Sequence, residues 1–508
     1  MRRRRLAAIV AIATFTVGGF TGCGKEARAP QPVPEAGDAL PEAVEFATAL
    51  QQKINVEALM GHLRALQQIA DANDGNRAAG TPGYDASLDY VAGILRDAGF
   101  EVQTPEFTAT VFDAKPGAVS LGGKTFEARA LEFTTGTPPA GVTAALVPAR
   151  VEDSPGCTPA DYDGLPVKGA VVLVDRGTCP FADKAAAAAE RGVAAMVVVN
   201  NVDGPLTGGT LGEDTDVTIP VVSVTKADGV QMREMAGEVP VPEATVKVET
   251  SKRELTTRNV IAQTTTGDTQ NVVMAGAHLD SVPEGPGIND NGSGSAAILE
   301  TAVQLGGSPQ VRNAVRFGFW SAEEIGLVGS RRYVESLNED QLKDIALYMN
   351  FDMLGSPNPG YFTYDGNQSS PVGSNQIPPR VPEGSAGIER TLVAYLDSAG
   401  KPAQDTFFDG RSDYDAFTLA GIPSGGLFSG AEEDMTQEQA DLWGGQAGVP
   451  FDPNYHKPGD NIDNIDQTSL GIQGAGVGYA VGLYAQDQSG RNGMPIRDDR
   501  TRHEIAPS

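Results

Sequence analysis

The chain has 508 residues, of which 66 are acidic and 38 are basic, so its formal net charge is −28. A chain of this length can bury at least one large core and is long enough for two domains, and its 40% of hydrophobic residues is the usual share in a soluble globular protein. The negative charge argues against nucleic acid as a partner, because binding to phosphates needs a basic face, and it favours a monomer that resists association.

The N-terminus has the pattern of an export signal. Arg2 to Arg5 precede a mostly apolar stretch, Leu6 to Phe20, that is too short to cross a bilayer as a stable helix. Thr21-Gly22-Cys23 follows, and a small residue directly before a cysteine resembles a bacterial lipobox. We therefore expect residues 1–22 to be a signal peptide and Cys23 to be lipidated, which would anchor an exported chain on the outer face of the cell membrane. The alternative is an ordinary secretory signal, after which the chain would be secreted.

The next segments predict a tether followed by helices. Residues 23–40 are rich in proline, alanine and charged residues, as expected of a tether. Between residues 41 and 70, apolar residues recur at helical spacing and predict a helix. A loop over residues 75–87, a second helix that ends near Ala98 and a strand over residues 101–112 are expected to follow.

Between residues 125 and 250 the sequence predicts a compact, β-rich unit. Two short apolar strands, AVVLVDRG and AAMVVVNN, flank the helix-like segment FADKAAAAAERG. The unit contains Cys157 and Cys179, the two cysteines that remain besides Cys23. In an exported chain a disulfide between them is the default expectation. Two free buried thiols are the alternative, and a metal site is disfavoured because no histidine is near.

From residue 258 onward, strands and helices alternate. NVVMAGAHLD, AVRFGFWSAEE and IALYMNFDMLG are predicted strands, and GSAAILETAVQL and LVGSRRYVESL are the predicted helices between them. This alternation predicts an α/β fold, in which a mixed, mostly parallel sheet is sandwiched by helices. Ligands bind to such sheets beyond the carboxyl ends of the strands. Residues 487–508 are polar and are expected to form a flexible tail.

Side chains that can bind metal follow these strands. They are His278, Asp280 and Asp290 after the first strand, Glu323 and Glu324 after the second, Asp352 after the third, and Tyr455 and His456 in a later loop. Imidazole and carboxylate are ligands of zinc, and carboxylates gathered at one sheet edge would repel one another without cations. Divalent cations would remove this repulsion, and pairs of metal ions ~3.5–4 Å apart are common in hydrolytic sites of this kind. Asp280 would accept a hydrogen bond from the second ring nitrogen of His278.

The prediction of a metal site rests on the joint placement of these residues. A single histidine at a strand end is more often structural than a ligand, and a single Glu-Glu pair usually lies in a solvated loop. His62, on a predicted helix surface, and His503, in the tail, are not expected to contribute.

Four motifs resemble peptidase family M28, the co-catalytic dizinc aminopeptidases. They are GAHLDSV with GINDNGSG, WSAEEIGLVGS, NFDMLG and YHKPGDN, in this order across residues 258–485, and GNRAAGTPGYDAS matches upstream. The segment VKGAVVLVDRGTCPFADKAAAAAERGVAAMVVVNN resembles a protease-associated (PA) domain. The resemblance implies a zinc exopeptidase fold formed by residues 41–124 and 251–486, into which a PA domain, residues 125–250, is inserted. With the lipobox, it points to the lipoprotein aminopeptidases of actinobacteria.

The resemblance also implies a role for each site residue. His278 and Asp352 would bind one zinc ion, Glu324 and His456 would bind the second, and Asp290 would bridge the two. Glu323 would be the general base that takes a proton from the attacking water and gives it to the leaving amine. Tyr455 would donate a hydrogen bond to the oxyanion. A strained or cis peptide bond is expected between Asp290 and Asn291.

Two further segments resemble the wall of the family's specificity site. In GRSDYDAF, residues 410–417, Arg411 and Asp413 would contact the substrate amine or support the metal ligands. A helix cap formed by Ser412 or Asp413 is an equal alternative. The apolar segment GIPSGGLFSG, residues 421–430, would line a pocket for a large hydrophobic side chain.

These residues favour an aminopeptidase that acts on peptides with a free N-terminus and a large hydrophobic first residue. Other activities of the same family remain open. A carboxypeptidase would need a basic pocket, a dipeptidase is a further alternative, and a glutaminyl cyclase with a single zinc is disfavoured because all five ligands are present. A binding protein without catalysis is the alternative from another class, and it would be expected to have lost its metal ligands.

Overall fold

The computed structural model of the chain describes residues 39–149, 155–206, 208–213, 215–237, 242–371, 380–489 and 493–505. The expected signal peptide, Cys23 and nearly all of the tether lie outside these residues. In the part of the chain that the structure describes, no helix is both long and apolar enough to span a membrane.

The chain begins with three helices, α1 (Pro41–Gln51), α2 (Val56–Asp71) and α3 (Pro82–Asp97). The single helix expected over residues 41–70 is therefore two helices: α1 ends at Gln51, and Asn55 starts α2 by accepting a hydrogen bond from the backbone of Ala58. Thr81 caps α3 in the same way, and Pro82 is its first residue, so α3 begins inside the segment expected to be a loop.

An eight-stranded sheet forms the centre of the larger, sheet domain. Its strands, in spatial order, are β1 (Glu101–Gln103), β11 (Val260–Gln263), β13 (Asn313–Trp320), β12 (Asp268–His278), β14 (Ile345–Phe351), β17 (Ser424–Phe428), β15 (Phe362–Tyr364) and β16 (Gln404–Thr406). The pairs from β13 through β12 and β14 to β17 are parallel, as is β15 with β16, whereas the other three pairs are antiparallel. The sheet is therefore mixed and mostly parallel, as expected.

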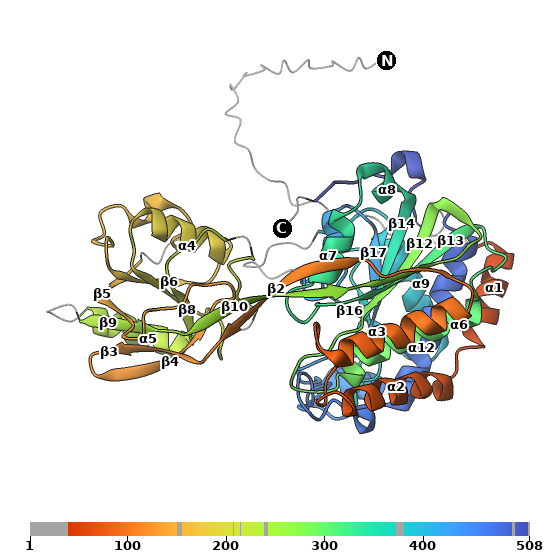
Figure 1. Cartoon of the computed structure of the whole chain (residues 1–508), viewed down its shortest axis with the longest axis horizontal. Coiled ribbons are helices and arrows are strands. Elements are labelled where there is room, and N and C mark those ends of the chain that lie inside the picture. The colour runs from red at the N-terminus through yellow and green to blue at the C-terminus, as the bar shows by residue number, and fades with distance from the viewer. Residues whose placement is uncertain are drawn as a thin grey trace, which may run out of the picture.

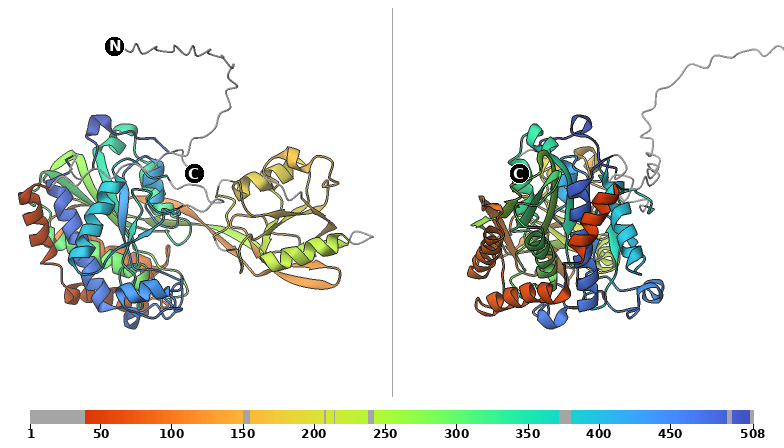
Figure 2. Two further views of the ribbon diagram at one scale, coloured as in Figure 1. Left: turned by 180° about the vertical axis from the view of Figure 1, so that it is seen from behind. Right: turned by 90° about the vertical axis from the view of Figure 1, so that its right-hand side faces the viewer.

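Helices cover both faces of this sheet (Figures 1 and 2). Alternate residues of β12 point to opposite faces, so Val273, Ala275 and Ala277 join one hydrophobic core while Met274 joins another. The first core packs against α2, α3, α6 (Gly294–Leu305), α9 (Ser385–Ser398) and α12 (Gln467–Gln486). The second core includes residues of α7 (Val328–Glu335), α8 (Glu339–Asp344) and α10 (Asp415–Leu419). The remaining helical segments of this domain are η2 (Ile288–Ser293), α11 (Gln437–Trp443), η3 (Ile462–Asn464) and η5 (Arg497–Asp499).

The second domain is a closed β-barrel inserted into the first, and we call it the barrel domain. Its strands are β3 (Gly117–Leu121), β4 (Lys124–Ala130), β8 (Val221–Val224), β7 (Ala195–Val199), β6 (Val171–Asp175), β5 (Val142–Pro148) and β9 (Glu243–Lys247). It also contains η1 (Pro159–Tyr162), α4 (Phe181–Glu190) and α5 (Lys226–Ala236). The barrel already includes β3, so it begins before residue 125, where the change in sequence pattern had placed the boundary.

A long antiparallel ribbon joins the two domains. It pairs β2 (Glu106–Ala114), which leads into the barrel, with β10 (Thr250–Arg258), which returns from it (Figure 1).

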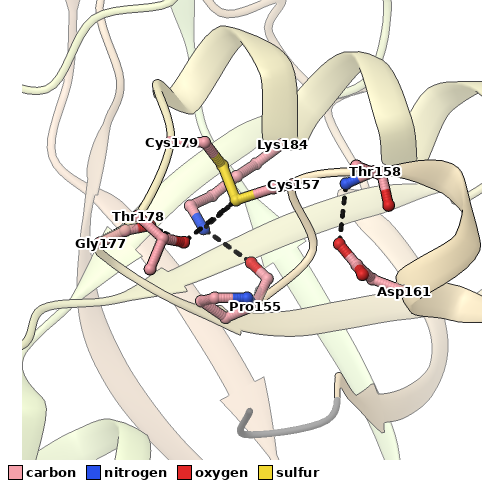
Figure 3. Close-up of a disulfide and its surroundings, with 8 residues drawn as sticks. All are labelled: Pro155, Cys157, Thr158, Asp161, Gly177, Thr178, Cys179 and Lys184. Carbon is pink, nitrogen blue, oxygen red and sulfur yellow. Dashed lines mark hydrogen bonds between the residues drawn. A yellow bond between two sulfur atoms is a disulfide. The ribbon is translucent and has the colours of Figure 1, made fainter. Parts of the chain in front are cut away.

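The expected disulfide is present in the barrel domain and joins Cys157 to Cys179 (Figure 3). The adjacent Lys184 is buried, and its ammonium group donates hydrogen bonds to the backbone oxygen of Pro155 at 2.6 Å and to the sulfur of Cys157 at 3.6 Å. Burial lowers the pKa of Lys184 to about 8. The ammonium group and the disulfide together hold the loops before η1 and before α4 against each other.

The expectation of a flexible tail over residues 487–508 is wrong for the described part of it. Arg500 donates hydrogen bonds to the backbone oxygens of Gln270 and Lys343, and Arg502 donates to those of Leu342, Ile345 and Gly421. Both arginines are buried. A polar composition suggested solvent exposure, but these guanidinium groups are buried and donate to backbone carbonyl groups of the sheet domain.

We expect the substitution Arg502→Ala to destabilise the sheet domain by about 2–3 kcal/mol, because a buried side chain loses its hydrogen bonds to the backbone oxygens of Leu342, Ile345 and Gly421. The free energy of unfolding in urea measures this effect. Arg497→Ala, in the same tail, is the matched control and should have a much smaller effect, since the side chain of Arg497 forms its ion pairs with Asp340 and Asp344, and a hydrogen bond with the backbone of Asp340, at the surface. Equal effects of the two substitutions would contradict a structural role for Arg502.

Candidate functional site

The carboxyl ends of β12, β13 and β14 meet at one edge of the sheet. Because β12 is parallel to both neighbours, His278 lies beside Trp320 in the register, and Gly276 lies beside Asn350. The chain continues from these ends into the loops that carry the expected ligands. The topology thus brings together His278, Asp290, Glu323, Glu324, Asp352 and His456, which come from five separate stretches of the chain.

Asp290 lies between two histidines. Its Oδ1 is 3.2 Å from Nε2 of His278, which is also 3.3 Å from Oδ1 of Asp352. Its Oδ2 is 3.2 Å from Nε2 of His456, which is 3.0 Å from Oε2 of Glu324. The site therefore consists of two sets of donor atoms that share the carboxylate of Asp290.

The spacing of these donors fits zinc. Nitrogen and oxygen ligands about 2.0–2.2 Å from a tetrahedral zinc ion lie roughly 3.3 Å from each other, which matches the separations around Asp290. In addition, Oε1 of Glu324 and Oδ1 of Asp352 are buried and have no hydrogen-bond partner among the described residues. Buried carboxylate oxygens without donors are costly unless a cation compensates them.

The electrostatics of the site favour bound positive charge. Burial raises the pKa of Glu324 to about 7, and the neighbouring Asp290 adds to this effect. Burial also raises the pKa of Glu323. Burial opposes protonation of His456, but its hydrogen bonds to Asp290 and Glu324 outweigh this and raise its pKa to about 11. The buried carboxylates thus hold positive charge close, and divalent cations could take the place of protons.

The prediction for Asp280 was wrong in its detail. Nδ1 of His278 hydrogen-bonds to the backbone oxygen of Asp280 at 3.1 Å, whereas the nearest carboxylate oxygen of Asp280 is 3.8 Å away. The carboxylate instead accepts hydrogen bonds from the backbone N–H groups of Glu323 and Glu324, at 3.3 and 3.4 Å. Asp280 therefore fixes the ring of His278 through its main chain and the loop after β13 through its side chain.

The peptide bond between Asp290 and Asn291 is cis, which confirms the expectation. Asp460 accepts hydrogen bonds from the backbone N–H groups of Asn289 at 2.8 Å and Asp290 at 2.9 Å. The side-chain oxygen of Asn291 accepts hydrogen bonds from the backbone of Gly294 and Met353. These buried contacts orient Asp290. The sequence analysis did not identify Asp460, although it stands in the YHKPGDN motif, four residues after His456.

Arg411 and Tyr455 lie beside the metal ligands. The rings of Tyr455 and His456 are stacked with centroids 3.9 Å apart, and a guanidinium nitrogen of Arg411 is 3.4 Å from the hydroxyl of Tyr455. Arg411 also forms ion pairs with Glu432 at 2.9 Å and Glu433 at 3.6 Å. Arg411 is thus placed to orient the Tyr455 hydroxyl.

Neither Ser412 nor Asp413 caps a helix. The nearest helix, α10, begins at Asp415 and has no side-chain cap. Ser412, which the sequence analysis did not predict as a site residue, donates a hydrogen bond to Oδ2 of Asp352 at 2.6 Å. Asp413 is buried, neither of its carboxylate oxygens has a hydrogen-bond partner among the described residues, and burial raises its pKa to about 7.

A cavity of about 850 Å³ opens over the candidate metal centre. Its lining includes His278, Asp290, Glu323, Asp352, Tyr455 and His456. Large apolar side chains form much of the rest of the wall: Met353, Phe362, Phe407, Phe408, Phe428 and Phe451. The segment at residues 421–430 contributes only Phe428 and Gly430, so most of the apolar wall comes from segments that the sequence analysis did not connect with the site. One lining residue, Arg176, belongs to the barrel domain.

The other two histidines have no place in this site. His62 contacts Tyr90 at 2.8 Å and Glu300 at 3.2 Å from helix α2, and it is partly buried rather than on an open helix surface. His503 joins the tail to the sheet domain through its backbone N–H, which donates to the oxygen of Ala420.

We expect Asp460→Asn to weaken the support of Asp290, because an amide has one acceptor oxygen where the carboxylate uses two. The loss of one buried hydrogen bond should lower the free energy of unfolding by about 1–3 kcal/mol. Denaturant unfolding of the two proteins measures this. Asp463→Asn, an exposed position nearby, is the control, and an equally large effect there would contradict the role given to Asp460.

Comparisons with known proteins agree with this geometry. The model of peptidase family M28 matches residues 259–481, and the model of the PA domain matches residues 142–232. A protein of Mycobacterium tuberculosis named "Probable lipoprotein aminopeptidase LpqL" is 63% identical over 505 residues, which cover 99% of both chains. "Leucine aminopeptidase 2" of Arthroderma otae is 40% identical over 90% of this chain and 89% of its own.

Solved structures of aminopeptidases are also similar to this chain. An aminopeptidase from Aneurinibacillus sp. strain AM-1 matches with a TM-score of 0.68 and 28% identity, over 87% of this chain and 96% of its own. A zinc aminopeptidase from Bacillus subtilis matches with a TM-score of 0.57 and 25% identity, over 87% of this chain and 97% of its own.

Proposed function

Because this chain belongs to peptidase family M28 and is an aminopeptidase, we propose that it releases large hydrophobic residues from the free N-terminus of peptides with two zinc ions held around Asp290. The observation that carries the proposal is the position of Asp290, whose two carboxylate oxygens each lie 3.2 Å from a different histidine. A carboxylate in this position suits a ligand that bridges two cations.

In the proposed centre, His278 and Asp352 would hold one zinc ion, and Glu324 and His456 would hold the other. Zinc ions bound there would supply Lewis acidity, which polarises the scissile carbonyl group and makes water a stronger acid. The protein fixes the ligands from behind: the main chain of Asp280 orients His278, Ser412 donates to Asp352, and Asp460 positions the backbone at Asp290.

Glu323 acts as the general base. It is next to the ligand Glu324 and lines the cavity, and its Oε2 lies 4.0 Å from Nε2 of His278. From there its carboxylate takes a proton from the attacking water and returns it to the leaving amine nitrogen, so that the amine departs in its neutral form.

Tyr455 stabilises the negative charge that develops on the carbonyl oxygen. Its hydroxyl oxygen accepts a hydrogen bond from Arg411 at 3.4 Å, so its own O–H can donate to an oxyanion. The stacking of Tyr455 on His456 fixes the direction of the phenol ring.

The apolar wall of the cavity supports a preference for large hydrophobic first residues. Phenylalanines 362, 408, 428 and 451 surround a space beside the candidate ligands, where burial of an apolar side chain is favourable. The fungal relative that is 40% identical is named a leucine aminopeptidase.

We also propose that the chain is exported and anchored to the membrane by a lipid on Cys23, and that it acts as a monomer. The mycobacterial relative, which matches over the full length, is named a lipoprotein aminopeptidase. The arginines, the apolar stretch and the cysteine at the N-terminus support the same location.

Glu323→Gln should lower kcat for Leu-p-nitroanilide by roughly a hundredfold or more, because removal of a general base costs about 10²–10⁴ in rate. Zinc content, measured by elemental analysis of the same sample, should stay at the wild-type value. Glu339→Gln, at an exposed position outside the site, is the control and should leave both quantities unchanged. A Glu323→Gln protein with wild-type kcat would refute the role of Glu323.

Removal of metal should abolish activity, and zinc should restore it in two equivalents per chain. His456→Ala and Asp352→Asn should each lower the zinc content by about one ion per chain, since each removes a ligand from a different donor set. Titration of the chelator-treated protein with zinc, followed by hydrolysis of Leu-p-nitroanilide, provides the measurement. Full activity with a single ion would contradict the dizinc centre.

A further inference from the structure

The barrel domain contributes one residue, Arg176, to the cavity above the candidate metal centre. Among the described residues that line this cavity, all others belong to the sheet domain. The barrel domain is thus more than a separate module joined by a ribbon, because one of its residues helps to line the cavity over the candidate metal centre.

The position of Arg176 is well defined. It follows β6 directly, and its backbone N–H donates to the oxygen of Val199, the last residue of the neighbouring strand β7. Its guanidinium group donates to the side-chain oxygen of Asn200 at 3.2 Å. Three residues later Cys179 is fixed by the disulfide to Cys157, so the loop that begins at Arg176 is tied down at both ends (Figure 3).

The cavity that Arg176 helps to line is acidic. The carboxylates that line the cavity are Asp290, Glu323, Asp352, Asp405, Asp409, Glu433 and Asp434. The other arginine of the lining, Arg411, forms ion pairs with Glu432 and Glu433. Arg176, by contrast, has no ion-pair partner within the described residues, and the acceptor of its side chain is the neutral amide of Asn200.

A peptide that enters this cavity brings charges of both signs. Its ammonium end is directed to the zinc ligands and their carboxylates, whereas the rest of the chain runs away from the metal centre on the leaving-group side. A guanidinium group without an acidic partner binds carboxylate strongly, because its planar N–H donors match the two carboxylate oxygens.

We infer that Arg176 binds a carboxylate on the leaving-group side of the substrate. The inference rests on the proposed function, because aminopeptidase action is what orients the substrate in the cavity. The carboxylate can be the C-terminus of a short peptide or the side chain of an acidic residue, and a fixed guanidinium group recognises either by the same chemistry. The barrel domain then selects peptides by the charge that follows the scissile bond.

The test compares substrates that differ only in this carboxylate. The first pair is Leu-Gly-Gly with a free C-terminus and the same peptide with a C-terminal amide. The second pair is the amides of Leu-Glu-Gly and Leu-Gln-Gly. Leucinamide has neither a carboxylate nor a nitro group on the leaving-group side and serves as the reference substrate. The proteins are the zinc-loaded wild type, Arg176→Gln, Arg176→Lys, and the matched control Arg129→Gln, which changes an exposed arginine of the same domain that does not line the cavity.

The wild type should favour the carboxylate member of at least one pair. Arg176→Gln should lower kcat/KM for that carboxylate substrate about tenfold, mainly by raising KM, because one charge-assisted hydrogen-bonded pair is lost. Arg176→Lys should retain part of the preference. Arg129→Gln should behave as wild type on every substrate. The Arg176 variants should keep measurable activity on the reference substrate, which shows that they are folded.

Loss of preference in the first pair would identify the C-terminal carboxylate as the ligand, and loss in the second pair would identify an acidic side chain. Either result supports the inference. If Arg176→Gln changes acid and amide substrates equally, or changes neither, the inference is overturned while the aminopeptidase function stands. If the wild type cleaves none of the substrates, the proposed function fails and this inference fails with it.

Discussion

The structure of the site depends on keeping several carboxylates close together and out of water. Asp290, Glu324 and Asp352 are ligand candidates, and Asp280 and Asp413 lie buried around them. Like charges at such separations are tolerated only when cations, protonated imidazoles or directed N–H groups compensate them. Two histidines supply part of this compensation, and the protein surrounds the carboxylates with backbone donors that are already in place.

The same requirement explains the buried polar groups in the neighbouring loops. Arg77 is fully buried, and its guanidinium group donates to the backbone oxygens of Leu279, Pro286 and Gly287. It therefore fixes the loop that leads from His278 to Asp290. Asp460 joins this loop to the one that carries His456. Histidine and aspartate ligands from distant parts of the chain are thus held by side chains that are themselves buried and hydrogen-bonded, which is how a metal centre is preorganised.

The sequence was sufficient for the donors because they follow hydrophobic strands. Strand ends in a parallel sheet converge, so His278, Glu323, Glu324 and Asp352 could be placed at one edge without coordinates. The sequence could not show whether a residue near the site acts through its main chain or through its side chain. At Asp280 the residue was right, but the backbone oxygen and not the carboxylate contacts His278.

The apolar wall was largely missed because Phe362, Phe408 and Phe451 come from segments with no distinctive pattern. Arg176 was missed because its approach to the cavity depends on how two domains are arranged. The buried arginines of the tail were missed because a polar composition does not reveal which carbonyl groups lack partners.

The insertion of the barrel domain between β1 and its partner strand β11 has a consequence for the order in which the chain can fold. Helices α1 to α3 and strand β1 leave the ribosome first, but β1 pairs with β11, which is synthesised only after the whole barrel. The barrel strands, by contrast, pair among themselves. During synthesis the inserted domain is therefore the first part that can complete its own core, while the N-terminal helices must wait with their apolar faces uncovered. A nascent chain of this protein thus passes through a period in which its middle is finished and its beginning is not, and that beginning is the part on which chaperones would be expected to act.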